Sequence, residues 1–164
     1  RDKQSITPYT ARPADAPDGT WRMHQKDVDR VQEFRKCIEC FLCQDVCHVL
    51  RDHRLHEEFI GPRYLVYAAA LEMHPLDVAD RVPALREQHG IGYCNITKCC
   101  TNVCPENITI TDNAIIPLKE RVVDEFFDPL GKLVKLFSRR SRDGGRGTGE
   151  GTERSVSTQG REAS

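Results

Sequence analysis

A long hydrophobic segment is missing from this sequence. The longest apolar run, residues 64–71, has eight residues, whereas a membrane-spanning helix needs roughly 20. We therefore expect that the chain does not cross a membrane by itself.

The sequence also lacks an excess of charge of either sign. Its formal net charge is −1 at pH 7, and its few aromatic residues are scattered rather than clustered. Nucleic-acid-binding domains usually carry a basic surface, and many add aromatic rings on which bases stack. Binding to nucleic acid is therefore not expected. The 164 residues, of which 38% are hydrophobic, suffice for one domain with a small core.

No secretion leader precedes the first residue, Arg1, and we expect that an upstream part of the protein is missing from this sequence. The eight cysteines occur in two tight groups, whereas a secreted scaffold of this size would disperse its cysteines for disulfide bonds. Metal binding in a reducing cytoplasm is the interpretation that we favour, with disulfides and zinc as alternatives.

The first cysteine group is a Cys-x2-Cys-x2-Cys-x3-Cys run formed by Cys37, Cys40, Cys43 and Cys47. Three thiolates at three-residue steps can bind three corners of an iron–sulfur cubane, and in two-cluster ferredoxins the fourth cysteine of such a run binds the other cluster. If the loop continued as a helix, Cys43 and Cys47 would lie on one face, about 5.4 Å apart along its axis. The run therefore predicts two iron–sulfur clusters.

The second cysteine group ends in a Cys-Pro pair, and Thr97 occupies the position at which a four-iron site would need its third thiolate. A hydroxyl does not replace a thiolate as an iron ligand, so three ligands remain, which suits a [3Fe-4S] cluster. The predicted ligands of this cluster are Cys47, Cys94 and Cys100. The predicted ligands of the [4Fe-4S] cluster are Cys37, Cys40, Cys43 and Cys104.

Cys99 and His48 are not assigned by this pattern. Cys99 is either a buried structural thiol, which we favour, or a fourth ligand of the second cluster. His48 follows a predicted ligand and could deliver protons to a substrate reduced nearby. Most other histidines are interpreted as solvated or capping residues.

The rest of the sequence predicts an all-α fold. Apolar residues at helical spacing predict a helix from Gln25 to the first cysteine. Two more helices, one from Gly61-Pro62 and one over residues 76–88, should form a hairpin. A fourth helix follows residues 109–112, its start delayed by Pro117.

The sequence predicts that the chain divides into three structural parts. Residues 1–24, with three prolines, should form an extended arm or linker. Residues 25–138 should form the helical domain, ending in a basic amphipathic segment that could lie on a membrane surface, a partner subunit or its own domain. Residues 139–164 contain six of the eleven glycines and should form a disordered tail.

Together the two cysteine groups resemble the C-terminal dicluster domain of the iron–sulfur subunit of succinate dehydrogenase and fumarate reductase. The phrases at residues 34–40 and 93–100 are particularly similar to the actinobacterial, menaquinone-linked form. The resemblance covers about residues 20–138, and it implies a small α-helical, dicluster ferredoxin-like domain.

The resemblance also implies a place in an electron-transfer chain. Electrons would pass from the flavin of a flavoprotein (FAD) subunit through [2Fe-2S], [4Fe-4S] and [3Fe-4S] clusters to menaquinone at a membrane-anchor cytochrome b subunit. The [2Fe-2S] cluster would belong to an N-terminal domain absent from this sequence, and the dicarboxylate site to the flavoprotein. The protein would be peripheral, on the cytoplasmic face of the bacterial cell membrane.

Two positions depart from the family pattern. Family members often have proline after the cysteine that matches Cys47 and histidine after the one that matches Cys94, both close to the quinone. Here these residues are His48 and Asn95, and we expect both near a quinone site.

Three alternatives stay open at this point. The chain could be the iron–sulfur subunit of another oxidoreductase, heterodisulfide-reductase-like or glycolate-oxidase-like, with two [4Fe-4S] clusters. Such a protein would normally have a complete second cysteine run, and Thr97 argues against it. The other two are a zinc-stabilised interaction module and a non-functional gene fragment.

Overall fold

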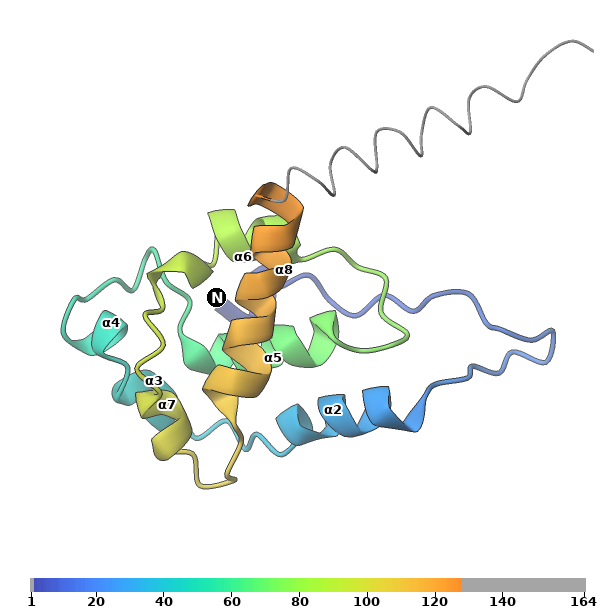
Figure 1. Ribbon diagram of the computed structural model, residues 1–164, viewed down its shortest axis with the longest axis horizontal. Helices are drawn as coiled ribbons and strands as arrows, with labels where there is room; N and C mark the ends of the chain where they lie inside the picture. Colours follow the sequence, from blue (N-terminus) through green and yellow to red (C-terminus); the bar gives the residue numbers. More distant parts are fainter. Residues whose placement is uncertain (1, 128–164) are drawn as a thin grey trace, which may run out of the picture. The chain divides into compact units, whose positions relative to one another are not determined.

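The computed structural model describes residues 2–127, and Figure 1 shows how their helices are arranged. The predicted all-α class is confirmed for this part of the chain, which contains no β-strand and only one isolated antiparallel bridge, between Ala11 and Asp77. None of its helices is both long enough and apolar enough to cross a membrane. The predicted segment that follows Pro129 and the predicted tail lie outside the described residues.

Ten helical elements follow one another in the described part. They are α1 (Asp2–Ser5), α2 (Gln25–Arg35), α3 (Leu42–Asp45), α4 (His48–Arg51), α5 (Pro62–Glu72), α6 (Val82–Glu87), the 3-10 turn η1 (Ile91–Tyr93), α7 (Cys99–Asn102), the π-helical turn η2 (Ile110–Ile115) and α8 (Ile116–Phe127).

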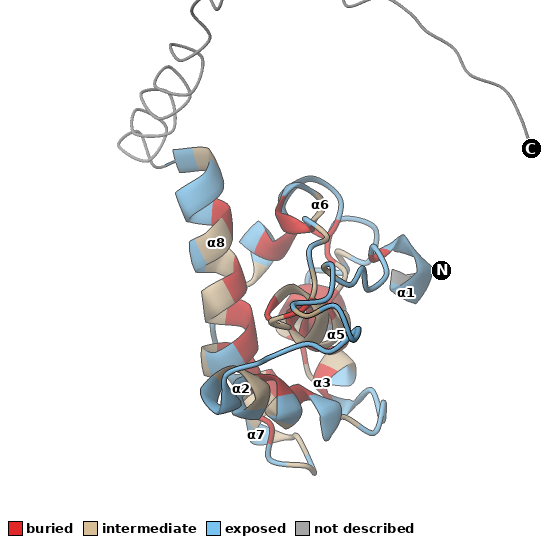
Figure 2. Cartoon of the chain, turned by 90° about the vertical axis from the view of Figure 1, so that its right-hand side faces the viewer, coloured by how far each residue is buried: buried red, intermediate tan, exposed pale blue. Residues whose placement is uncertain are grey.

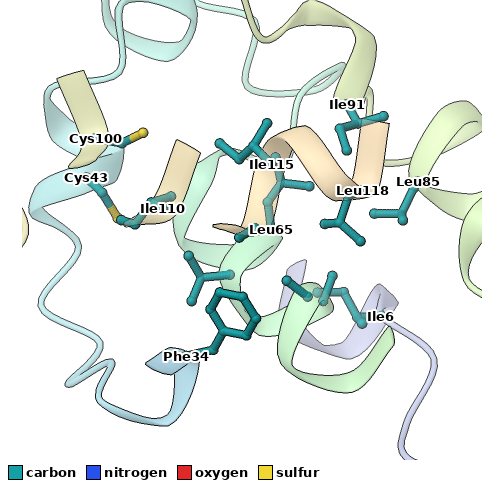
Figure 3. Packing of buried hydrophobic residues seen from close by; sticks show 14 of the residues in the cluster. Ile6, Phe34, Cys43, Leu65, Leu85, Ile91, Cys100, Ile110, Ile115 and Leu118 are labelled. Carbon is teal, nitrogen blue, oxygen red and sulfur yellow. The ribbon is translucent and has the colours of Figure 1, made fainter. Parts of the chain in front are cut away.

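Helix α5 lies at the centre of the fold, and α2 and η2 pack against it. Its middle is rich in alanine and leucine, and Leu65 and Ala69 are fully buried. Figure 2 shows the buried residues along α5 and on the inner face of α8, and Figure 3 shows Leu65 and Leu118 within the same apolar cluster. Burying one such leucine side chain contributes about 1.5–3 kcal/mol, so these two helices supply much of the core.

The predicted start of α5 is confirmed, because Pro62 is its first residue. The predicted hairpin is wrong: α6 is shorter than expected and packs chiefly against α8. Residues 76–78 bond to the N-terminal arm instead of forming a helix. The N–H of Arg12 donates to the carbonyl of Leu76 over 2.8 Å, and the N–H of Val78 donates to the carbonyl of Thr10 over 2.9 Å.

Arg81 ties the N-terminal arm to the helices. The residue is 1% exposed, and its guanidinium donates 2.8 Å hydrogen bonds to the carbonyls of Thr7 and Pro8. It also pairs with Asp77 at 2.8 Å. After α1 the arm is extended, and it lies along the helical body with Ile6 buried in the core.

Two further expectations on local structure have different outcomes. The delayed start of the last described helix is confirmed, since η2 precedes α8 and Pro117 is the second residue of α8. The continuous helix through Cys43 and Cys47 is wrong. Helix α3 ends at Asp45, and Cys47 adopts an extended conformation immediately before α4.

Candidate metal centres

The two cysteine groups sit on two copies of the same backbone loop. Left-handed residues, which are uncommon outside glycine, occur at Glu39 and Phe41 in the first loop and at Ile96 and Lys98 in the second. Each loop then enters a four-residue helix, α3 or α7. The second loop therefore repeats the first 57 residues later, and Thr97 takes the place of a cysteine between two left-handed residues.

The two loops face each other through α3 and α7, which pack together. Cys43 and Cys100 are both buried at this contact and are drawn in Figure 3. The pKa of Cys43 is raised to about 12, first by burial and then by the neighbouring thiols of Cys100, Cys37 and Cys40. The fold thus gathers cysteines from both groups.

The first centre is a cavity lined by four cysteines from both groups. Together with its opening to solvent, it has about 360 Å³ of space free of protein atoms, and its cysteines are Cys37, Cys40, Cys43 and Cys104. Val66, Ile108 and Ile110 supply apolar walls. These four cysteines are the predicted [4Fe-4S] ligand set, and the structure places them around one space; ligation itself stays a prediction.

Glu33 helps to bring Cys104 to the first group, because it joins α2 to the segment just after Cys104. The N–H of Thr109 donates to Glu33 Oε1 over 2.7 Å, and the side-chain amide of Asn113 donates to Oε2 over 2.5 Å. Burial raises the pKa of Glu33, but these hydrogen bonds lower it more, so the net pKa is below its usual value. The contact therefore favours an ionised carboxylate.

The second centre involves Cys47, Cys94, Cys99 and Cys100. The pKa of Cys47 is raised first by burial and also by Cys99 and Cys94, against backbone hydrogen bonds that lower it. The pKa of Cys100 is raised first by burial and again by Cys99 and Cys94, although the Thr111 hydroxyl lowers it. The predicted [3Fe-4S] ligands are thus neighbours. Cys99 is a neighbour too, and it is half-buried rather than buried; whether it binds iron stays a prediction.

His48 and Asn95, the two residues expected near a quinone, are in direct contact. Asn95 Nδ2 lies 2.7 Å from His48 Nε2, and Thr97 Oγ1 lies 3.3 Å from His48 Nδ1. With the amide of Asn95 as donor, Nε2 accepts and Nδ1 carries the ring proton. Thr97 Oγ1 also lies 3.4 Å from Cys99 Sγ. A polar chain therefore runs along the rim of the second centre.

The cysteine arrangement fits iron–sulfur clusters better than single ions. Ligands of one zinc ion lie about 2.3 Å from the metal and converge on one point, and within residues 2–127 no group of three or more potential ligands does so. The thiols of the first centre instead line a cavity. Left-handed residues flank the middle position of both loops, and such a backbone pattern can direct N–H groups toward anions such as sulfide. The donor set and the space therefore fit the group that the cysteine pattern predicts.

Sequence reasoning missed Arg63, which also lines the first cavity. The residue is 3% exposed, and its guanidinium forms an ion pair with Glu39, which lies between the first two cysteines. The signal was present in the sequence, because Arg63 is the only charged residue between Gly61 and Leu71. A lone charge in an apolar segment marks a position at which burial needs a specific partner.

Comparison with known proteins defines the class of this domain. Residues 33–108 match the family model described as "4Fe-4S dicluster domain". With the helical fold and the two crossed cysteine loops, this match gives the segment a dicluster, ferredoxin-like fold.

The more particular relationship comes from individual relatives. A chain of the Mycobacterium smegmatis Sdh1 complex in the apo form is 58% identical, with a TM-score of 0.73, over 79% of this chain and 54% of that chain. A subunit of the fumarate reductase (CoM/CoB) of Methanothermobacter marburgensis is 30% identical over 127 residues, 76% of this chain and 25% of the relative. The fumarate reductase iron-sulfur subunit of Mycobacterium tuberculosis is 28% identical over 108 residues, 63% of this chain and 42% of the relative.

The chain is therefore a relative of the iron–sulfur subunits of fumarate reductase and succinate dehydrogenase, and the resemblance seen in its cysteine pattern is confirmed. It spans between a quarter and about half of the length of the three proteins compared above.

Proposed function

We propose that this chain is the two-cluster part of an electron-transfer subunit in a succinate:quinone oxidoreductase or fumarate reductase. The observation that carries the proposal is the crossing of the two cysteine groups, since Cys104 lines the same cavity as Cys37, Cys40 and Cys43. This crossing is typical of two-cluster ferredoxins. It suits a relay, because clusters that share neighbouring ligands lie close together.

In this proposal the first cavity holds a [4Fe-4S] cluster and the second centre a [3Fe-4S] cluster. When bound, such clusters accept and release single electrons, and the protein sets their potentials through ligation, hydrogen bonds to sulfur and burial. Thr97 supports the three-iron type. Its loop keeps the backbone of the first loop but has no thiolate at the middle position.

The rim of the second centre is where we place the quinone. Asn95 is exposed, and its amide, which carries two N–H groups, can donate to a quinone carbonyl while His48 holds it in place. The partners would be a flavoprotein subunit that holds FAD and the dicarboxylate, and a membrane-anchor cytochrome b subunit that presents menaquinone. The subunit would then lie on the cytoplasmic face of the membrane.

Iron and acid-labile sulfide analysis with EPR spectroscopy of the air-oxidised complex tests the proposal. A [3Fe-4S] cluster is paramagnetic when oxidised, whereas a [4Fe-4S]²⁺ cluster is diamagnetic. We expect a three-iron signal in the oxidised state and a further signal from the four-iron cluster after reduction. A colourless protein with zinc and no iron would overturn the proposal. Iron without the oxidised-state signal would overturn the three-iron assignment.

A further inference from the structure

Arg63 places a buried positive charge beside the first centre. Its side chain is 4% exposed and lines the cavity that holds the four cysteines. Among the hydrogen bonds of the described residues its Nε atom has no partner, although it is shielded from solvent. A buried N–H without a partner is unfavourable, so this atom points to a group that the protein atoms alone do not supply.

The carboxylate of Glu39 neutralises Arg63 only in part. It pairs with the Nη2 end of the guanidinium, and it is 46% exposed and shared with Lys3, whose Nζ lies 2.8 Å away. Ion pairs with an exposed member are screened by water and contribute little. The arginine therefore keeps much of its positive field on the cavity side.

The position of Arg63 relative to the cysteines is fixed by Gln44, the residue after Cys43. Gln44 Oε1 accepts from the N–H of Arg63 over 3.1 Å, and Gln44 Nε2 donates to the carbonyl of Ile60 over 3.1 Å. A Cβ atom on Gly61 would lie 2.0 Å from Gln44 Oε1, and Gly61 has a φ of +88°. The glycine thus allows the close approach of α3 to the start of α5.

Two other charges act on the same cavity. Glu106 lines it from the side of Cys104 and is half-buried, so its charge opposes that of Arg63. The N-terminus of α5, an 11-residue helix, carries a partial positive charge and acts in the same direction as Arg63. Arg63 is the only basic side chain in the lining of this cavity.

We propose that Arg63 raises the reduction potential of the cluster bound at this cavity, with Nε as a hydrogen-bond donor to cluster sulfur. The inference rests on the proposed function, because it requires a [4Fe-4S] cluster there. Reduction adds one electron to the cluster, and a nearby cation stabilises the more negative product more than the reactant. Glu39 opposes this effect, and the pair together sets the potential.

Opposite charge changes in the two partners provide the test. The midpoint potential of the [4Fe-4S] cluster is measured by EPR-monitored redox titration of the complete complex. We expect Arg63→Met to lower it by about 59 mV or more, which is a tenfold change in the one-electron reduction constant. Glu39→Gln, which leaves Arg63 with less compensation, should raise it. Arg63→Lys should recover the part due to charge but not the part due to Nε.

The direction of the shifts separates this role from a structural one. If the ion pair only held the loop in place, Arg63→Met and Glu39→Gln would change the potential in the same direction or not at all, and either result would overturn the proposal. Glu39→Gln retains Arg63, so it still gives an answer if Arg63→Met loses its cluster. Arg121→Met is the control, because Arg121 on α8 pairs with Glu72 outside the cavity.

The same titration separates failure of this inference from failure of the proposed function. If the unmodified complex shows no reducible four-iron signal, the proposed function fails. If it shows that signal and the variants leave its potential unchanged, the function stands and the role of Arg63 is wrong.

Discussion

Replacing Arg81 by methionine should destabilise the protein more than any other single change at a charged residue considered above. Arg81 and Asp77 are each 1% exposed and lie 2.8 Å apart. The guanidinium also satisfies the carbonyls of Thr7 and Pro8, and Glu72 Oε2, at 3.7 Å, adds a second negative charge. Methionine fills much of the volume but removes the guanidinium donor from Asp77 Oδ2 and from the carbonyls of Thr7 and Pro8.

The magnitude follows from the burial of both partners. Removing one member of a buried ion pair costs about 3–5 kcal/mol, because the other charge stays buried and uncompensated. Arg121→Met provides the matched control. Arg121 also pairs with Glu72, at 2.9 Å, but its side chain is 39% exposed and Glu72 keeps Arg81 at 3.7 Å, so its loss should cost clearly less than the loss of Arg81.

Urea unfolding with two probes measures both effects. Circular dichroism follows the helices, and the fluorescence of Trp21, the single tryptophan, follows the arm, where its indole N–H donates to the carbonyl of Arg12 over 3.0 Å. The double variant Arg81→Met with Asp77→Asn should be more stable than the sum of the single losses predicts, since it removes the uncompensated charge. A loss below about 1 kcal/mol for Arg81→Met would refute the reasoning.

Three further predictions concern the second centre, pH and one glycine. Thr97→Cys should convert the three-iron centre into a four-iron one, so that the oxidised EPR signal disappears; an unchanged signal would contradict the ligand assignment. Burial lowers the pKa of His89 and also that of His74, so the folded state resists protonation of both side chains. The free energy of unfolding should therefore fall as the pH drops below about 6.5. The fall should be at most about 1.4 kcal/mol per histidine and pH unit. The variant His89→Gln should flatten that slope in denaturation series at about pH 5.5–7.5, and an equal slope would exclude this role. Gly90→Ala should lower the free energy of unfolding, measured in urea, by about 2 kcal/mol or more. Gly90 has a φ of +58°, and a Cβ atom would lie 1.9 Å from the backbone oxygen of Glu58. An unchanged free energy of unfolding would argue against this geometry.

The cysteine arrangement could be predicted from sequence because thiolate spacing is dictated by the cluster rather than by the fold. The crossing of Cys104 to the first group needed no knowledge of the intervening helices. Likewise, Gly61-Pro62 predicted the start of α5, since proline suits the first position of a helix and glycine the turn before it.

Other features depend on contacts between distant segments, which local patterns do not encode. Residues 76–78 are predicted to begin a helix, but their backbone bonds to the arm at residues 10–12, and tertiary hydrogen bonds override local propensity. The partner of Arg63 is Glu39, 24 positions earlier. Sequence could show a lone charge at position 63 but not which carboxylate or cavity it meets.

The repeated loop has a consequence for how such a domain can change. The loop around Thr97 keeps both left-handed residues of its counterpart although the side chain between them is different. Backbone shape therefore does not distinguish the two halves. A single codon change at this position could alter the number of iron atoms bound by one loop while every helix stayed in place. The iron content of such a domain can therefore evolve more easily than its fold.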